Sequence, residues 1–206
     1  MTQFQHYQPT KLLFGAGEIS KIGQLVAQYG KRCLVVSEPI FDAVKPAYDR
    51  IFALLASEGI TVTHFDGVVP NPPTTVVELG RQVAQAAECD VVLAVGGGSS
   101  IDTAKIIAAT IKVPEIDWTH WFKTYDSPFG DIAALPASVV PLIAVPTTSG
   151  TGSQVTQAAV ITDVEQHAKL TLFHPQFFPV EAVIDPELML TLPPRMTAMT
   201  GFDAFS

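Results

Sequence analysis

The sequence predicts an α/β fold: a doubly wound, mostly parallel sheet with helices on both faces, of the Rossmann-like class. Two short runs, CLVVS (33–37) and VVLAVG (91–96), are continuously apolar and rich in valine, which is typical of strands covered on both faces. Segments whose apolar residues recur at helical spacing lie between such runs. A strand, a helix and a second strand in that order need a crossover connection, so we expect the strands to be parallel.

The first half of the chain supplies three predicted helices. Apolar residues between 19 and 29 fall at helical spacing, and Gly30 ends that helix because glycine readily adopts the backbone of a C-terminal cap. Thr75 and Glu78 have the spacing of a capping box at the start of a later helix. The elements predicted before residue 91 are, in order, a helix ending at Gly30, the strand 33–37, a helix ending at Gly59, the strand 60–65 and a helix over 76–87.

The second half continues the alternation. The strand 91–96 is followed by a helix from Ser100 to about Ile111. A polar loop that contains tryptophan and proline then extends to Pro141. The apolar run LIAVP (142–146) predicts a further buried strand, which ends in a second polar loop.

Composition limits the classes of partner. The chain has 206 residues, of which 48% are hydrophobic and 16% charged, enough for one large domain or slightly more. The formal net charge is −8 and no run of lysine or arginine is present, which argues against a nucleic-acid partner. No apolar stretch approaches the roughly 20 residues that a membrane helix needs, and the N-terminus has no signal-peptide pattern. We therefore expect a cytoplasmic protein with no membrane partner.

The segment GGGSS (96–100) separates a predicted strand from a predicted helix. Ligands of parallel sheets bind beyond the carboxyl ends of the strands, which is where these glycines lie. Without Cβ atoms, glycines let backbone amides approach a pyrophosphate, and the helix N-terminus adds unpaired donors. A tight turn alone would need only one or two glycines. The pattern favours phosphate binding, although it matches neither G-x-G-x-x-G nor the P-loop.

A second polar loop, PTTSGTGS (146–153), follows the next buried strand. Its threonine hydroxyls, at Thr147, Thr148 and Thr151, suit a ribose or a nicotinamide. A flexible linker is the alternative, but the loop points to the same edge of the sheet as the glycines. Two such loops at one edge indicate a dinucleotide.

Glu38 follows the strand 33–37 directly. In a doubly wound dinucleotide domain an acidic residue at this place binds the ribose hydroxyls, and a 2′-phosphate would meet a like charge. The sequence therefore predicts NAD rather than NADP, with an exposed loop glutamate as the alternative.

Four segments together resemble the iron-containing (group III) alcohol dehydrogenase family. They are LLFGAG (12–17), GGGSSIDTAK (96–105), VPTTSGTGSQVTQAAVITD (145–163) and VIDPELMLTLPPRMTAMTGFDAFS (183–206). The resemblance implies a dinucleotide-binding α/β domain of dehydroquinate synthase-like form, followed by a helical domain. It divides the chain into a cofactor domain, residues 1–185, and the start of a helical metal-binding domain, residues 186–206, whose remainder is missing.

The resemblance also implies roles for individual residues. Asn71, in PNPP, would contact the adenosine side of the cofactor, and Lys169 would join the threonines around the ribose and nicotinamide. Asp203 matches the first metal ligand of the family, while the histidine that the family places four residues later would lie beyond Ser206. The candidate cofactor residues are thus Glu38, Asn71, Gly96, Gly97, Gly98, Ser99, Thr147, Thr148, Thr151 and Lys169. We expect iron or zinc in the intact protein only, and a frayed chain after about Thr200.

The implied activity is that of an NAD(P)-dependent, metal-dependent dehydrogenase that interconverts alcohols and aldehydes or ketones by hydride transfer. Its partner would be a small-molecule alcohol or aldehyde, and a homodimer is left open. Two alternatives also stay open. One is a nucleotide-binding fragment without catalysis. The other is a sugar-phosphate cyclase such as dehydroquinate synthase, which shares the fold and the use of NAD. Resemblance to it would need a Val-Val-Gly-Asp type continuation after the glycines, and GGGSSID (96–102) argues against it.

Overall fold

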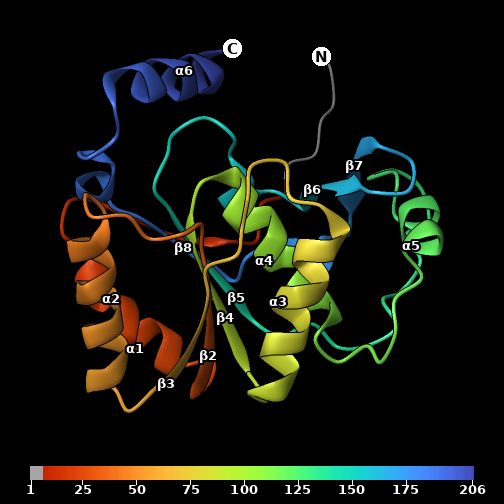
Figure 1. Cartoon of the computed structure of the whole chain (residues 1–206), viewed down its shortest axis with the longest axis horizontal. Coiled ribbons are helices and arrows are strands. Elements are labelled where there is room, and N and C mark those ends of the chain that lie inside the picture. Colours follow the sequence, from red (N-terminus) through yellow and green to blue (C-terminus); the bar gives the residue numbers. More distant parts are fainter. Residues whose placement is uncertain (1–6) are drawn as a thin grey trace.

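The computed structural model describes residues 7–206, and its centre is a six-stranded sheet in which every neighbouring pair is parallel. Figure 1 shows the sheet with its helices. In spatial order the strands are β1 (Lys11–Phe14), β8 (Glu181–Ile184), β5 (Leu142–Pro146), β4 (Val91–Gly96), β2 (Arg32–Val36) and β3 (Thr61–Phe65). The predicted parallel α/β class is confirmed.

Helices cover both faces of this sheet. The 3-10 helix η1 (Glu18–Lys21), α1 (Ile22–Ala27) and α2 (Lys45–Ser57) pack on one face, and α3 (Thr74–Ala86) and α4 (Gly98–Thr110) on the other. Successive residues of β2 alternate between the two cores: Cys33 and Val35 join the first, and Leu34 and Val36 the second. Burial on both sides explains why the central strands read as unbroken apolar runs.

A separate hairpin lies beside α4. Its strands β6 (Ala158–Asp163) and β7 (Ala168–Phe173) are antiparallel, and their apolar residues Ala159, Ile161 and Leu172 are buried against the α3–α4 core. The sequence analysis did not predict this hairpin, nor the edge strand β1 and its neighbour β8. These strands are short or half-exposed, so they lack the apolar pattern of the central strands.

The expected loop up to Pro141 is partly wrong, because it contains helix α5 (Trp118–Thr124). Asp117 caps this helix by accepting a hydrogen bond from the His120 amide at 3.0 Å. Trp121 and Phe122 bury their rings in the core. Two tryptophans within four residues therefore mark a packed helix rather than a surface loop.

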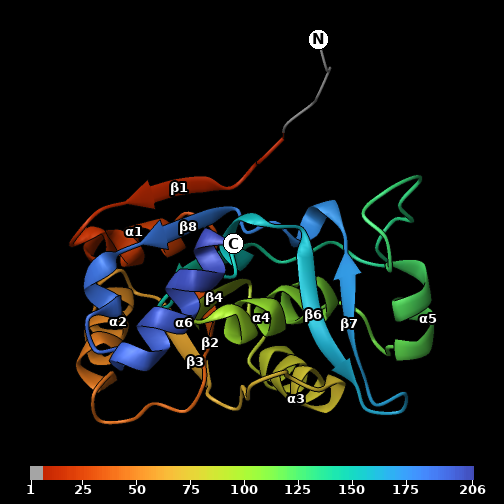
Figure 2. The same ribbon diagram turned by 90° about the horizontal axis from the view of Figure 1, so that it is seen from above.

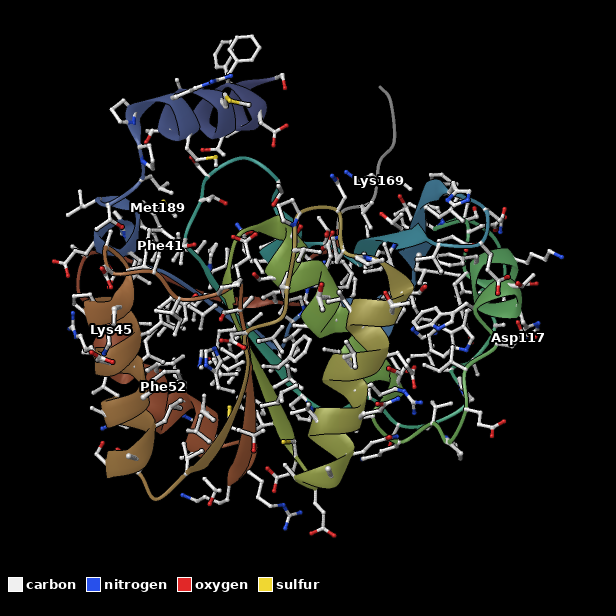
Figure 3. The ribbon with its side chains drawn as sticks, in the orientation of Figure 1. Phe41, Lys45, Phe52, Asp117, Lys169 and Met189 are labelled. Carbon is white, nitrogen blue, oxygen red and sulfur yellow. The ribbon has the colours of Figure 1, made fainter. Side chains whose placement is uncertain are left out.

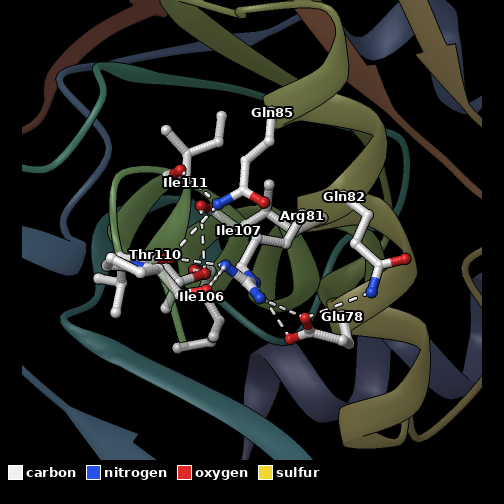
Figure 4. A network of polar contacts seen from close by, with 10 residues as sticks. Glu78, Arg81, Gln82, Gln85, Ile106, Ile107, Thr110 and Ile111 are labelled. Carbon is white, nitrogen blue, oxygen red and sulfur yellow. Dashed lines mark hydrogen bonds and ion pairs between the residues drawn. The ribbon is translucent and has the colours of Figure 1, made fainter. Parts of the chain in front are cut away.

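The predicted capping box at Thr75 and Glu78 is also wrong. Helix α3 begins at Thr74, two residues earlier than predicted, and has no side-chain cap. Glu78 instead forms an ion pair with Arg81, whose guanidinium donates a hydrogen bond of 2.6 Å to the Val113 carbonyl just beyond α4 (Figure 4). Glu78 thus holds Arg81 in place for a contact between α3 and the C-terminal end of α4.

The last helix, α6 (Pro194–Phe205), extends over the sheet, as the view from above shows (Figure 2). The expectation of a frayed chain after Thr200 is wrong, since the helix continues to Phe205. All its side chains are exposed or half-buried, including Met199, Phe202 and Phe205. In the part of the chain that the structure describes, no helix is both long enough and apolar enough to cross a membrane.

Candidate functional site

The two polar loops lie side by side at the carboxyl edge of the sheet. Strands β4 and β5 pair with Gly96 opposite Pro146, and the Thr147 amide donates a 3.0 Å hydrogen bond to the Gly96 carbonyl. This register brings together the glycine loop (residues 96–100) and the threonine-rich loop (residues 146–153), as we expected for loops that follow parallel strands.

The glycine loop needs its missing Cβ atoms for two different reasons. Gly96 has φ of +150°, and a Cβ there would collide with the Ser100 hydroxyl. Gly98 has an ordinary φ, but a Cβ would lie 2.8 Å from Cγ2 of Thr151 in the neighbouring loop. Backbone conformation therefore requires the first glycine, and close approach of the two loops requires the third.

Helix α4 begins at Gly98, two residues earlier than predicted, and its N-cap residue is Gly97. Gly97 carries no side chain that could accept a hydrogen bond from the first turn. The Ile101 amide donates to the Gly97 carbonyl, which leaves the preceding amides without partners inside the helix. Three amides and the positive end of the helix dipole therefore face the carboxyl edge, an arrangement suited to an anion.

A cavity of about 280 Å³ opens between the start of α4 and the hairpin. Five predicted cofactor residues line it: Asn71, Gly98, Ser99, Thr151 and Lys169. The other lining residues are Pro72, Asp102, Ser153, Thr156, Ala158 and Val160. Segments up to about 100 residues apart in the sequence therefore form one polar hollow.

The hairpin brings Asn71 and Lys169 to this cavity. Thr162 of β6 donates its hydroxyl to the Asn71 carbonyl at 3.0 Å, and Thr162 pairs directly with Lys169 of β7. Asn71 itself has φ of +53°, a left-handed conformation that asparagine tolerates better than most residues. Lys169 is exposed and lies on the upper side of the hairpin (Figure 3).

Glu38 and four other predicted residues, Gly96, Gly97, Thr147 and Thr148, do not line the cavity. Glu38 lies at the carboxyl end of β2, beside β4, and is exposed, although partial desolvation by nearby protein raises its pKa. The Ser37 hydroxyl donates to the Glu38 carbonyl at 2.7 Å. Thr147 and Thr148 lie in the second loop, where Thr148 Oγ1 would be 3.2 Å from a Cβ on Gly97. Glu38, Thr147 and Thr148 thus place further polar groups at the carboxyl edge of the sheet, on either side of Gly97.

Sequence reasoning missed two buried charges on α4. Asp102 lines the cavity, and its Oδ2 accepts a 3.0 Å hydrogen bond from the Val160 amide. Its Oδ1 is buried and has no hydrogen-bond partner among the described residues. Burial raises the pKa of Asp102, whereas burial lowers the pKa of Lys105, one turn further on, to about 8. The sequence held a signal for this pair, because two charged residues lie three positions apart just after the glycine loop.

Asp203 contacts the threonine-rich loop from α6. A Cβ on Gly150 would lie 2.7 Å from Oδ2 of Asp203, and Ser149 Oγ is 3.4 Å from Thr200 Oγ1. The carboxylate is exposed and lies close to the candidate site. Among residues 7–206, no three His, Cys, Asp or Glu side chains are grouped so that they could hold a metal ion.

Comparison with known proteins agrees with this geometry. Residues 9–186 match the family model described as iron-containing alcohol dehydrogenase. The chain is 39% identical to choline dehydrogenase of Bacillus subtilis and 35% identical to NADH-dependent butanol dehydrogenase A of Clostridium acetobutylicum, covering 100% of this chain and 50% and 51% of theirs. An alcohol dehydrogenase from an archaeal halo-thermophile of a Red Sea brine pool superposes with a TM-score of 0.89 at 33% identity, over 100% of this chain and 52% of that one. The chain thus spans about half the length of the relatives it matches.

Proposed function

Because this chain belongs to the iron-containing alcohol dehydrogenase family, we propose that it forms the NAD-binding half of an oxidoreductase that interconverts alcohols and aldehydes or ketones. The observation that carries the proposal is the polar cavity between the N-terminus of α4 and the hairpin. It lies beyond the carboxyl ends of parallel strands, where dinucleotides bind in such sheets. The relatives named above differ in substrate, so no particular alcohol is assigned.

The residues present fit a dinucleotide. The unpaired amides at the start of α4 match a pyrophosphate, and the close approach of Thr151 to Gly98 brings the second loop beside them. Asp102 Oδ1 is buried and accepts no hydrogen bond from the described residues, although the Lys105 ammonium lies 3.7 Å away, so a bound hydroxyl or amide could donate to it. When bound, the nicotinamide would supply the hydride acceptor or donor.

Each candidate residue has a proposed part in binding. The loop from Gly96 to Ser99 would hold the pyrophosphate with backbone amides. Thr147, Thr148 and Thr151, with Lys169, would orient the ribose and nicotinamide by hydrogen bonds. Asn71 and Glu38 would contact the adenosine side, with Glu38 accepting hydrogen bonds from ribose hydroxyls.

Titration with NADH and with NADPH tests the proposal. We expect saturable binding of NADH, and weaker binding of NADPH because its 2′-phosphate meets the Glu38 carboxylate. Glu38→Ser should bring the two dissociation constants at least about threefold closer, by removing one unfavourable charge pair of about 0.7 kcal/mol. Asp42→Ser, which removes another exposed acid from the same segment, is the matched control and should leave the ratio unchanged. Absence of NADH binding would overturn the proposed function, and equal or tighter NADPH binding would overturn the role of Glu38.

Asp203 is proposed as a ligand of iron or zinc in a protein that also contains the second half found in the relatives. The described residues alone do not complete a metal site. In a chain joined to that second half, Asp203→Ala should reduce the bound metal at least about tenfold after dialysis, because charged ligands dominate such sites. Glu187→Ala, an exposed acid of the same terminal segment, is the control. Full metal content in the Asp203 variant would remove this residue from the site.

A further inference from the structure

Lys105 is one of the largest side chains that the structure buries completely, and it does not line the cofactor cavity. Its residue exposure is 1%, although lysine is seldom buried without partners. The ammonium donates hydrogen bonds to the Ala158 carbonyl at 2.6 Å and to Thr156 Oγ1 at 3.1 Å. It also lies 3.7 Å from Oδ1 of Asp102, one turn earlier on α4. The charge is therefore compensated inside the protein.

The acceptors of this ammonium lie where the hairpin begins. Ala158 is the first residue of β6, and Thr156 lies two residues before it. Asp102 accepts a hydrogen bond from the amide of Val160, two residues beyond Ala158 in the same strand. Two opposite charges on one turn of α4 thus bind three alternate positions, two in β6 and one just before it. We call this set of contacts the α4–β6 brace.

Most of the brace forms part of the cavity wall, since Asp102, Thr156, Ala158 and Val160 line the cavity. From Val160 the strand continues to Thr162, which pairs with Lys169 and holds the Asn71 carbonyl. Lys169 and Asn71 form one wall of the cavity, and the start of α4 forms the other. The distance between these walls depends on how β6 is held against α4. A buried ion pair adds little net stability compared with apolar residues, so stability alone does not explain its presence here.

We infer that Lys105 is a positioning residue: it fixes the hairpin against the phosphate-binding helix and thereby places Lys169 for the cofactor. This inference rests on the proposed function, because Lys169 needs a bound dinucleotide to act upon. Lys105 itself does not line the cavity, so its effect on binding passes through the groups that it contacts, Asp102 and the hairpin. Apolar packing of Ala159, Ile161 and Leu172 keeps the hairpin attached when the brace is removed.

Lys105→Met tests the inference, because methionine keeps the length of the side chain and removes the ammonium. Without any cofactor, we expect faster amide hydrogen exchange in residues 158–172 and little change in α1 and α2. We expect the NADH dissociation constant to rise about tenfold, within the range found for coupled sites. Lys112→Met, which removes an exposed lysine just beyond the same helix, should change neither measurement. If the amides of the hairpin exchange at the same rate in the Lys105 variant as in the unmodified chain, the inference is wrong. This outcome does not depend on whether NADH binds.

A double-mutant cycle separates positioning from a general structural role. Lys169→Met alone should raise the NADH dissociation constant about tenfold. If the two effects were independent, the double variant would show a rise of about a hundredfold, and we expect a rise well below that. Fully multiplicative losses would show that Lys105 does not act through Lys169. If Lys105→Met fails to fold, Thr156→Val can replace it, because this change removes one acceptor of the ammonium. We then expect smaller changes in the same direction, both in the amide exchange of the hairpin and in the NADH dissociation constant. Failure of the unmodified chain to bind NADH contradicts the proposed function, whereas the exchange measurement still decides whether the brace holds the hairpin.

Discussion

Gly98→Val is expected to abolish measurable NADH binding while the chain keeps its secondary structure. A Cβ at Gly98 would lie 2.8 Å from Thr151 Cγ2 and 3.0 Å from Thr151 Oγ1, and valine adds two methyl groups beyond it. The side chain would push the second loop away from α4 and fill the place where the pyrophosphate is proposed to lie. Overpacking of about 3 kcal/mol corresponds to at least about a hundredfold rise in the dissociation constant.

Binding by calorimetry and folding by far-ultraviolet circular dichroism distinguish the local effect from unfolding. Gly98 has an ordinary φ, so valine introduces no left-handed backbone strain. Gly201→Val is the matched control, because a Cβ at Gly201 would meet no atom within 4 Å. NADH affinity close to that of the unmodified chain in the Gly98 variant would show that the phosphate does not lie at this loop.

Gly23→Ala is expected to lower the free energy of unfolding by about 3 kcal/mol, the upper part of the range for overpacked cores. Helix α1 packs so closely on α2 that a Cβ at Gly23 would collide with the Leu54 carbonyl oxygen, and its carbonyl carbon would be 2.9 Å away. Both atoms belong to the backbone of α2, so the strain cannot be relieved by a change of rotamer. The helices would have to separate and lose buried contacts.

Thermal unfolding measures this effect. For a chain of this size we expect the Tm to fall by about 6–12 °C, from 2–4 °C for each kcal/mol. Gly201→Ala, in the open part of α6, should leave the Tm unchanged or raise it slightly, because alanine favours helix more than glycine does. An unaltered Tm for Gly23→Ala would mean that α1 and α2 can adjust their spacing at little cost.

The central elements could be predicted because their signals are local. Strands β2, β4 and β5 are buried on both faces, which leaves an unbroken apolar run in each. The glycines from 96 to 98 stand out for the same reason, since three consecutive residues without side chains are visible in the sequence itself. Local patterns mislead where a side chain has a distant partner. Glu78 has the spacing of a capping box but binds Arg81, which in turn reaches the end of α4.

The sequence by itself determined the fold class, the two polar loops at one edge of the sheet and the family to which they are similar. Only the tertiary structure decided which of the candidate residues share a cavity. It added Asp102 to these residues, and it showed Lys105 buried behind them. The physical reason is that periodicity and glycine content depend on neighbouring residues, whereas the walls of the cavity are joined by contacts between remote ones. Thr162 and Asn71 are 91 positions apart, and Lys105 and Ala158 are 53 apart. A buried charge is stable only when folding brings its partners into contact with it. The role of such a residue can therefore be recognised only in the folded structure.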